Sequence, residues 1–382
     1  VLLSTERMNR IRDVSSPDNV LVAEAGVILA DIQTAAEAAD RLFPLSLAAE
    51  GSCRIGGNLA TNAGGVQVLR YGNARDLCLG VEAVLPNGEI LHGLKRLRKD
   101  NTGFDLRNLL IGSEGALGVI TAASLRLFPR PSEVSTAFLA VETPAHSVEL
   151  LNQLRAALGE VISAFELIDV AGVEFLEETG LAQPNPMTPM PRWSVLVEVG
   201  GRKGVGAALE EALANAFAND LATDGTIAQT DTQRQTFWKI RESIPEANRL
   251  VGAIASHDVS VPVARLPEFI DKGAALFGQH HPQLRINCFG HVGDGNLHYN
   301  IYPPKGGDRA DYRGQAEEIS RMVHDLADET DGSISAEHGI GRLKAADLER
   351  YGDPAKLSAM RAIKAALDPA GIMNPGAVLR RN

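Results

Sequence analysis

The order of expected helices and strands between residues 132 and 345 constrains the fold more than any other feature of this chain. Alternating apolar residues, typical of strands, and apolar residues at every third or fourth position, typical of helices, follow one another as strand, helix, strand, strand, helix, strand. This order is found twice. The first copy has expected strands at 135–142, 161–169, 193–199 and 226–229 and expected helices at 147–158 and 205–219. The second copy has expected strands at 257–263, 284–289, 296–302 and 333–335 and expected helices at 266–279 and 316–328.

Each copy has the split βαβ order of a ferredoxin-like unit. We therefore expect an α+β fold in which two such halves form one large antiparallel sheet with helices on one face. Residues 1–131 differ from this region because they are rich in glycine and asparagine, and Pro129 and Pro131 end them. Residues 346–382 contain one expected helix, 354–367, which is too small for a domain and should pack on another region. The expected domains are 1–131, 132–345 and 346–382.

Charge and cysteine content exclude several classes of protein. The chain has 37 basic and 48 acidic residues and a net charge of -11, which argues against non-specific binding to nucleic acid. No apolar run approaches the roughly 18 residues that cross a bilayer. Cys53, Cys78 and Cys288 are odd in number and widely spaced, so they indicate neither a disulfide framework nor a cysteine zinc site. We expect a reduced, cytoplasmic compartment.

Glycine clusters at 56–58, 61–65 and 112–118 are the first candidate binding elements. Glycines allow backbone amides to approach an anion such as a pyrophosphate, although a set of β-turns would have the same composition. Neither the dinucleotide-binding fingerprint nor the P-loop spacing fits them, so a nicotinamide Rossmann domain is not supported. The cluster at 200–206 also fails both spacings, and we interpret it as a strand-to-helix turn.

The segment 290–300 is the strongest candidate for metal chemistry. His298 and Asn300 alternate on one face of an expected strand, and the glycine turn before them can bring His291 to the same face. Glu337, followed by His338, is the best candidate for a third ligand. The alternative is two hydrogen-bonded histidines in a buried turn.

Arg241, in an expected helix, is a candidate for binding a carboxylate, because its guanidinium can donate two parallel hydrogen bonds. A solvent-exposed arginine is the alternative.

Eight segments in this order resemble the FAD-linked oxidase family of the vanillyl-alcohol-oxidase type, in particular its D-2-hydroxyglutarate and D-lactate dehydrogenase branch. They are 55–58, 61–65, 70–72, 99–103, 112–118, 291–300, 337–339 and 374–376. The resemblance implies an FAD-binding domain of the p-cresol methylhydroxylase (PCMH) type at 1–131 and a substrate-binding cap domain at 132–345. It also implies that the N-terminal FAD pyrophosphate-binding loop is missing from this chain, so that FAD binding would be weakened or lost.

The resemblance assigns roles to individual residues. It implies that the divalent metal, usually zinc, is held by His291, His298 and Glu337, and that His338 is the catalytic histidine. It implies that Arg241 and Asn300 bind substrate. The implied FAD contacts are Gly57, Asn58, Thr61, Asn62, Gly64, Gly65, Tyr71, Ser113, Glu114, Gly118, Ile120 and Asn374.

The implied function is FAD-dependent oxidation of a D-2-hydroxy acid, such as D-2-hydroxyglutarate, D-lactate or D-malate, to the 2-keto acid. The metal would assist deprotonation of the 2-hydroxyl, and hydride would pass to flavin N5. A protein like the glycolate oxidase flavin subunit and a flavin-independent metal hydrolase are the alternatives. Expected partners are the small substrate, a second copy in a homodimer, and a soluble electron acceptor such as an electron-transfer flavoprotein, or a quinone.

Two positions depart from the pattern of hydroxyglutarate-type relatives. Ser256 stands where some relatives have lysine, and Pro245 stands where they have threonine. Both changes weaken the expectation of a dicarboxylate substrate.

Overall fold

The computed structural model describes residues 1–380 and divides into two compact units. Unit 1 comprises residues 1–130 together with the chain from Glu337 onward, and unit 2 comprises residues 131–336. The second boundary was predicted at residue 345, whereas in the structure it lies between Ala336 and Glu337.

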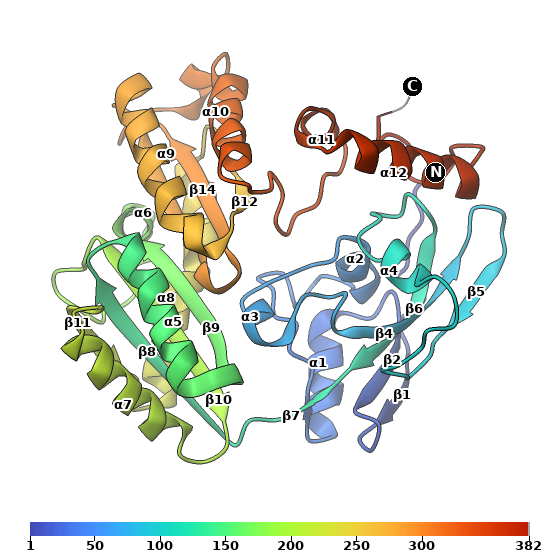
Figure 1. The fold of residues 1–382 in the computed structure, drawn as a ribbon, viewed down its shortest axis with the longest axis horizontal. Coiled ribbons are helices and arrows are strands. Elements are labelled where there is room, and N and C mark those ends of the chain that lie inside the picture. The colour runs from blue at the N-terminus through green and yellow to red at the C-terminus, as the bar shows by residue number, and fades with distance from the viewer. Residues whose placement is uncertain (381–382) are drawn as a thin grey trace. The chain divides into compact units, whose positions relative to one another are not determined.

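Unit 1 is built on a five-stranded antiparallel sheet with the order β1-β2-β6-β4-β5 (Figure 1). Helices α1 and α2 contact this sheet and enclose a core that includes Leu21, Ile32 and Leu125. The strands are β1 (Ile11–Ser15), β2 (Val20–Glu24), β4 (Cys78–Val84), β5 (Ile90–Gly93) and β6 (Val119–Arg126), with a separate pair of β3 (Arg41–Leu42) and β7 (Phe128–Pro129). The helices are α1 (Leu29–Ala38), α2 (Ile55–Ala60), α3 (Val68–Tyr71), α4 (Leu106–Leu110), α11 (Ala345–Tyr351) and α12 (Pro354–Leu367).

The C-terminal helix α12 belongs to unit 1. Ile363 and Leu367 pack against the core, and Lys364 Nζ donates to Ala116 O at 2.7 Å. The preceding helix α11 was not expected from the sequence, and it gives this segment two helices in place of one.

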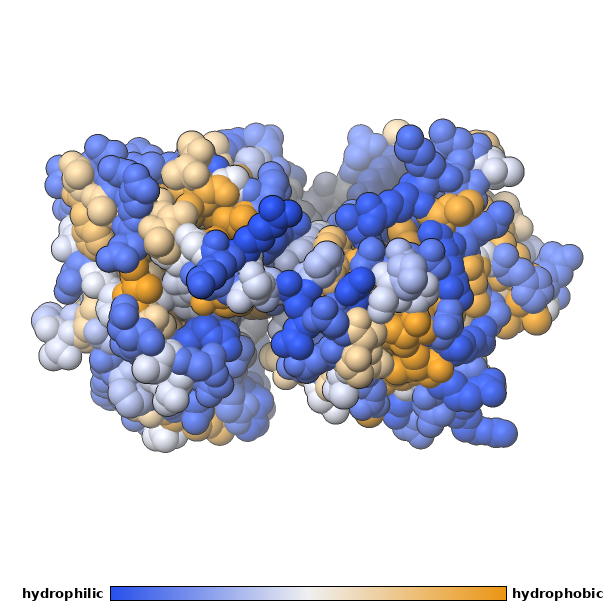
Figure 2. Space-filling model, turned by 90° about the horizontal axis from the view of Figure 1, so that it is seen from below, coloured by the Kyte–Doolittle hydropathy of each residue, from blue (hydrophilic) through white to orange (hydrophobic). Residues whose placement is uncertain are grey.

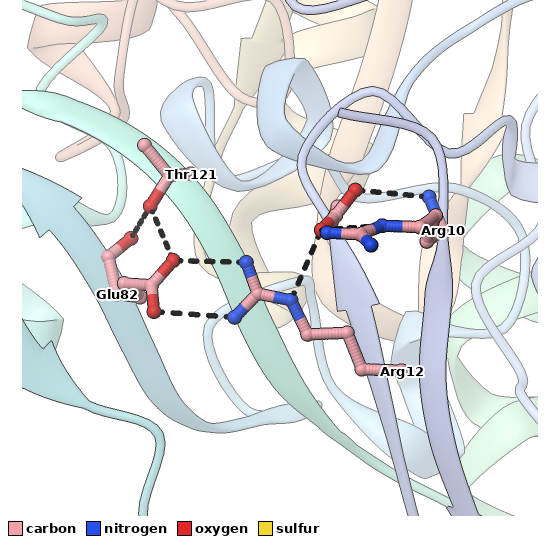
Figure 3. Close-up of polar contacts among 5 residues, drawn as sticks. Arg10, Arg12, Glu82 and Thr121 are labelled. Carbon is pink, nitrogen blue, oxygen red and sulfur yellow. Dashed lines mark hydrogen bonds and ion pairs between the residues drawn. The ribbon is translucent and has the colours of Figure 1, made fainter. Parts of the chain in front are cut away.

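An ion network ties the outer strand β1 to the rest of the sheet (Figure 3). Arg12 donates to the two carboxylate oxygens of Glu82 on β4 at 3.0 and 3.1 Å and to Glu24 on β2 at 3.2 Å. Glu24 also accepts from the backbone and guanidinium of Arg10, and Glu82 accepts from Thr121. Arg12 holds the pKa of Glu82 below its usual value. Burial raises the pKa of Glu24, but the hydrogen bonds from the two arginines outweigh burial and lower it.

Unit 2 contains a seven-stranded antiparallel sheet with the order β11-β8-β10-β9-β13-β14-β12. The two expected halves meet where β9 pairs with β13, which confirms that they form one sheet. The last expected strand, 333–335, is reduced to a single bridge between Ser333 and Ser260. The strands are β8 (Glu133–Val141), β9 (Ile162–Asp169), β10 (Trp193–Gly201), β11 (Asp224–Ile227), β12 (Asp258–Ser260), β13 (Arg285–His291) and β14 (Asn296–Tyr302).

Helices cover both faces of this sheet, so the expectation of helices on one face is wrong. Helices α5, α7, α9 and α10 contact one another on one face, and α6 and α8 pack together on the other (Figure 1). The reason is visible in β9, where all eight residues are buried, because a strand buried on both faces needs cover on both sides. The helices are α5 (Pro144–Leu158), α6 (Val170–Glu178), α7 (Val205–Ala218), α8 (Asp231–Val251), α9 (Leu266–His280) and α10 (Ala316–Glu329).

The glycine cluster at 200–206 is a strand-to-helix turn between β10 and α7, as predicted. The N–H groups of Gly204 and Gly206 donate to the carboxylate of Glu133 at 2.6 and 2.8 Å. Gly204 has a φ of 99°, which favours glycine. A carboxylate of the chain itself thus occupies the amides that a phosphate would otherwise bind.

The surface drawn in Figure 2 is mainly hydrophilic, and apolar residues form smaller patches on it. Within residues 1–380, no helix is both long enough and apolar enough to span a membrane.

Candidate functional site

His291 and His298 converge at the end of the β13–β14 hairpin in unit 2. Phe289 pairs with His298 and His291 pairs with Asn296, so all four side chains lie on one face of the sheet. One ring nitrogen of each histidine lies within 4.8 Å of the other, and the ring centroids are 5.8 Å apart. Gly295 permits the turn between the strands, because its φ is 81° and a Cβ there would lie 2.0 Å from Val261 O. The predicted convergence of the two histidines is therefore present in this unit.

Glu166 is a buried acid in this site that the sequence analysis missed. It lies on β9 directly opposite His291 and is completely buried. His291 Nδ1 donates to Glu166 Oε1 at 2.5 Å, and Arg241 Nε donates to Glu166 Oε2 at 2.8 Å. Burial raises the pKa of Glu166, but the adjacent His291 and Arg241 outweigh burial and hold it well below its usual value. The available signal was an acid in the interior of the largely apolar stretch 162–168.

Arg241 is buried on α8, which excludes the alternative of a solvent-exposed arginine. The side chain is 6% exposed, and its guanidinium lies 4.8 Å from the ring centroid of Phe289. Its Nε is bound to Glu166, whereas its two terminal nitrogens have no hydrogen-bond partner among the described residues. Two guanidinium nitrogens of this kind are able to donate parallel hydrogen bonds to a carboxylate.

Asn300 is also buried, and its side chain has a structural role in unit 2. The backbone N–H of His257 donates to Asn300 Oδ1 at 3.0 Å. This bond joins β14 to the segment before β12. A substrate contact at Asn300 could use its amide nitrogen or the second lone pair of Oδ1.

The first predicted FAD contacts lie on α2 and directly after it in unit 1. Gly56 N–H donates to Ala25 O, which brings the start of α2 against the end of β2. A Cβ on Gly57 would meet nothing within 4 Å, so a ligand can approach the backbone there. Asn58 is 6% exposed, and its Oδ1 has no hydrogen-bond partner within residues 1–380. Thr61 Oγ1 donates to Gly57 O at 3.1 Å, so its hydroxyl is bonded inside the helix.

Several other predicted FAD contacts have structural bonds of their own. Asn62 Oδ1 accepts from Arg75 N–H at 2.9 Å, and Ser113 Oγ donates to Leu110 O at 2.8 Å. Tyr71 packs edge-on against Phe128, with ring centroids 4.8 Å apart. Burial raises the pKa of Tyr71.

Gly118 directly precedes β6, and Ile120 is the second residue of that strand. A Cβ on Gly118 would come within 3.1 Å of Val84 O, and Ile120 belongs to the hydrophobic core. The side chain of Ile120 therefore packs inside unit 1, so a ligand contact would use its backbone.

Glu337 lies against the glycine segment after α2 in unit 1. Gly65 N–H donates to Glu337 Oε1 at 2.5 Å. A Cβ on Gly64 would lie 2.5 Å from the same oxygen, so only glycine leaves room for the carboxylate in this position. His338 follows directly in the chain.

Glu114 holds the loop that follows His338. Its carboxylate oxygens accept from the N–H groups of Ile340 and Gly341, both at 2.7 Å. Asn374 Nδ2 donates to the backbone oxygen of Glu114 at 2.6 Å. Glu114 was predicted as an FAD contact, and its carboxylate is engaged with the chain itself. Three distant segments are joined at this residue.

Comparison with known proteins gives two family matches. Residues 130–378 match the model described as FAD linked oxidases, C-terminal domain, and residues 1–93 match the model described as FAD binding domain. Among solved structures, p-cresol methylhydroxylase with substrate bound has a TM-score of 0.74 at 16% identity, covering 98% of this chain and 79% of that one. Alkyldihydroxyacetonephosphate synthase has a TM-score of 0.70 at 18% identity, covering 97% and 66%. These two likenesses show the fold.

Curated relatives cover nearly the whole chain. The mitochondrial D-2-hydroxyglutarate dehydrogenase of Arabidopsis thaliana is 38% identical over 381 residues, covering 99% of this chain and 67% of that protein. The mitochondrial D-2-hydroxyglutarate dehydrogenase of Danio rerio is 39% identical, covering 100% and 70%. The D-2-hydroxyglutarate dehydrogenase of Xanthomonas citri is 35% identical, covering 98% and 79%. The chain belongs to the FAD-linked oxidases and is an FAD-dependent oxidoreductase of that family.

Proposed function

We propose that this protein oxidises a D-2-hydroxy acid to the 2-keto acid, with FAD in unit 1 as the hydride acceptor and a divalent ion bound by His291, His298 and Glu337. The observation that carries the proposal is the pair of imidazoles beside the buried Arg241, because this face of unit 2 combines ion ligands with a carboxylate-binding group. The relatives named D-2-hydroxyglutarate dehydrogenases support the substrate class.

The residues of unit 1 fit FAD. The same short helix has an open position beside Gly57 and a buried acceptor, Asn58 Oδ1, that lacks a partner in the described part of the chain. A buried polar atom without a partner is costly, so a ligand donor at Asn58 has a physical reason. FAD, when bound, supplies the chemistry that accepts a hydride.

The histidines fit a divalent ion. The bond from His291 Nδ1 to Glu166 leaves Nε2 as the coordinating nitrogen, and a carboxylate behind a ligating histidine is a usual arrangement in zinc sites. Glu337 is the residue after Ala336, whose N–H donates to the backbone oxygen of Asp258. Asp258 lies on β12 and pairs with His298 on β14. The backbone of Glu337 is therefore one peptide bond away from a residue that is hydrogen-bonded to β12. An ion there would polarise the substrate hydroxyl and lower its pKa.

Arg241 and His338 would have separate roles in the reaction. The two terminal nitrogens of Arg241 would bind the substrate carboxylate as a bidentate fork. We propose that His338 removes the proton of the 2-hydroxyl, because a neutral imidazole can accept a proton near neutral pH. The proton would move to a ring nitrogen of His338 as the hydride leaves C2.

Pro245 is relevant to whether the substrate carries a second carboxylate. It lies four residues after Arg241 on α8, and residues four apart share a helix face. Proline has no side-chain hydrogen-bond donor, so it offers nothing to a second carboxylate. We therefore propose that a monocarboxylate such as D-lactate competes well with D-2-hydroxyglutarate.

The test is an anaerobic panel of D- and L-2-hydroxy acids, with loss of the oxidised-flavin absorbance measured on the FAD-loaded protein. Rapid reduction by at least one D-acid, with its L-enantiomer at least tenfold slower, is the expected result. Absence of reduction by every acid in the panel would reject the function. Re-oxidation of the reduced protein by a soluble electron-transfer flavoprotein or by a quinone would identify the acceptor.

A further inference from the structure

We infer that Glu166 is a positioning residue that fixes the ion ligand His291 and the substrate arginine Arg241 through one carboxylate, an inference that rests on the proposed function. Each oxygen has its own partner, with Oε1 on His291 at 2.5 Å and Oε2 on Arg241 at 2.8 Å. Three elements, β9, β13 and α8, thus meet at one side chain.

The register of the sheet explains why this acid reaches both groups. Glu166 and His291 are directly opposite each other in the pairing between the two halves of unit 2. Directly opposite side chains in an antiparallel pair are close neighbours on the same face. Arg241 approaches from the helix that covers this face. The Phe289 ring lies 4.8 Å from the guanidinium of Arg241 and 4.9 Å from the imidazole ring of His298.

A buried carboxylate is a poor choice for stability alone. Desolvation of a charge costs several kcal/mol, and buried ion pairs often stabilise no more than apolar side chains of similar size. Glu166 has no exposed surface, and its two partners are the ion ligand and the carboxylate-binding arginine of the proposed site. A role in orienting these two groups accounts for an acid at this position.

The chemistry of the two oxygens makes Glu166→Gln an informative change. Gln presents one acceptor oxygen and one NH2 group, which only donates. If the NH2 group faces Arg241, it meets the donor Nε–H. If it faces His291, Nδ1 must accept, and the ring proton moves to Nε2, the nitrogen that would coordinate the ion. Either orientation disturbs one of the two groups.

Glu198 on β10 provides a matched control, because it also binds a residue of α8. Glu198 is also buried, and it accepts from Trp238 Nε1 on α8 at 2.7 Å and from Thr136 Oγ1 at 2.9 Å. Glu198→Gln therefore removes a buried carboxylate under α8 without touching His291 or Arg241.

The test measures zinc affinity of chelator-treated protein by calorimetry and, separately, KM and kcat for the best D-acid of the panel. Loss of such a partner typically weakens metal binding by about 10- to 100-fold, and we expect this loss in Glu166→Gln with a raised KM. Glu166→Asp, which keeps the charge, should recover part of the affinity, and Glu198→Gln should bind zinc like the wild type. The melting temperature of each variant shows whether it is folded.

Two results would overturn the inference. Wild-type zinc affinity and KM in Glu166→Gln would remove Glu166 from this role while the proposed function stands. Equal losses in Glu166→Gln and Glu198→Gln would assign the effect to general destabilisation of α8. If the wild type itself neither binds zinc nor is reduced by a D-acid, the proposed function fails, and this inference fails with it.

Discussion

Replacing Gly64 with alanine should displace the carboxylate of Glu337 without unfolding unit 1. The new Cβ would lie 2.5 Å from Glu337 Oε1. In real structures a Cβ essentially never lies closer than 3.0 Å to a non-bonded heavy atom of another residue. The carboxylate must therefore move by about half an ångström or more, or rotate away. It would then lose the hydrogen bond from Gly65 N–H.

The expected magnitudes separate stability from function. Loss of a hydrogen bond to a charged group lowers the free energy of unfolding by about 1.5–3 kcal/mol. A Gly-to-Ala replacement raises it by roughly 0.4–1 kcal/mol, because alanine restricts the unfolded chain. The net loss of about 1–2 kcal/mol should leave the protein folded. A functional group must lie within roughly 0.5 Å of its productive position, and a displacement of 1 Å can cost about 100-fold in rate. We therefore expect flavin reduction to slow by about 10- to 100-fold, with weaker zinc binding.

Gly51→Ala is the matched control, because a Cβ there meets nothing within 4 Å. Stopped-flow flavin reduction and zinc titration of both variants, each with a melting curve, complete the assay. Wild-type reduction rate and zinc affinity in a folded Gly64→Ala protein would refute the reasoning, because the position of Glu337 would then have no bearing on either process.

Three further predictions follow from the site and the sheet. His338→Ala should retain FAD but slow flavin reduction by about 100-fold or more, and an unchanged rate in stopped-flow would remove His338 as the base. Arg241→Lys should raise KM for the D-acid by at least about tenfold because a lysine cannot form the bidentate fork, whereas an unchanged KM would place the substrate carboxylate elsewhere. Arg12 and its partners lower the pKa of Glu82 and Glu24, so the stability from this network is complete above their unfolded pKa of about 4.3 and is lost as pH falls through the lower folded values. Urea unfolding from pH 6 to pH 2 should show a smaller loss of stability in Glu82→Gln than in the wild type, and equal losses would contradict the role of the network.

Periodic apolar patterns predicted most of unit 2 from the sequence. The expected helix at 266–279 is observed as Leu266–His280, and the expected strand at 296–302 is observed as Asn296–Tyr302. The helix was predictable because its buried residues form one stripe. The strand was predictable because Asn296, His298 and Asn300 alternate with apolar residues, although nearly all of its positions are buried. The presence of helices on both faces of the sheet was not predicted. A strand such as β9 is buried on both sides, so its sequence lacks the alternation that would indicate where the helices lie.

The candidate site was predictable only where its residues are close in sequence. His291 and His298 belong to one hairpin, so strand alternation was enough to bring them together. Glu166 is 125 residues from His291 and 75 residues from Arg241, and no local pattern joins positions so far apart. The same reason applies to the carboxylate of Glu114, which binds amides 226 and 227 residues later.

The most direct test of the account is flavin reduction by the best D-acid before and after removal of divalent ions. Metal analysis should find about one ion per chain, chelation should abolish reduction while FAD stays bound, and added zinc should restore it. His291→Ala should lack both the ion and the restored activity. Full-rate reduction in protein shown to be free of metal would contradict the role assigned to His291, His298 and Glu337.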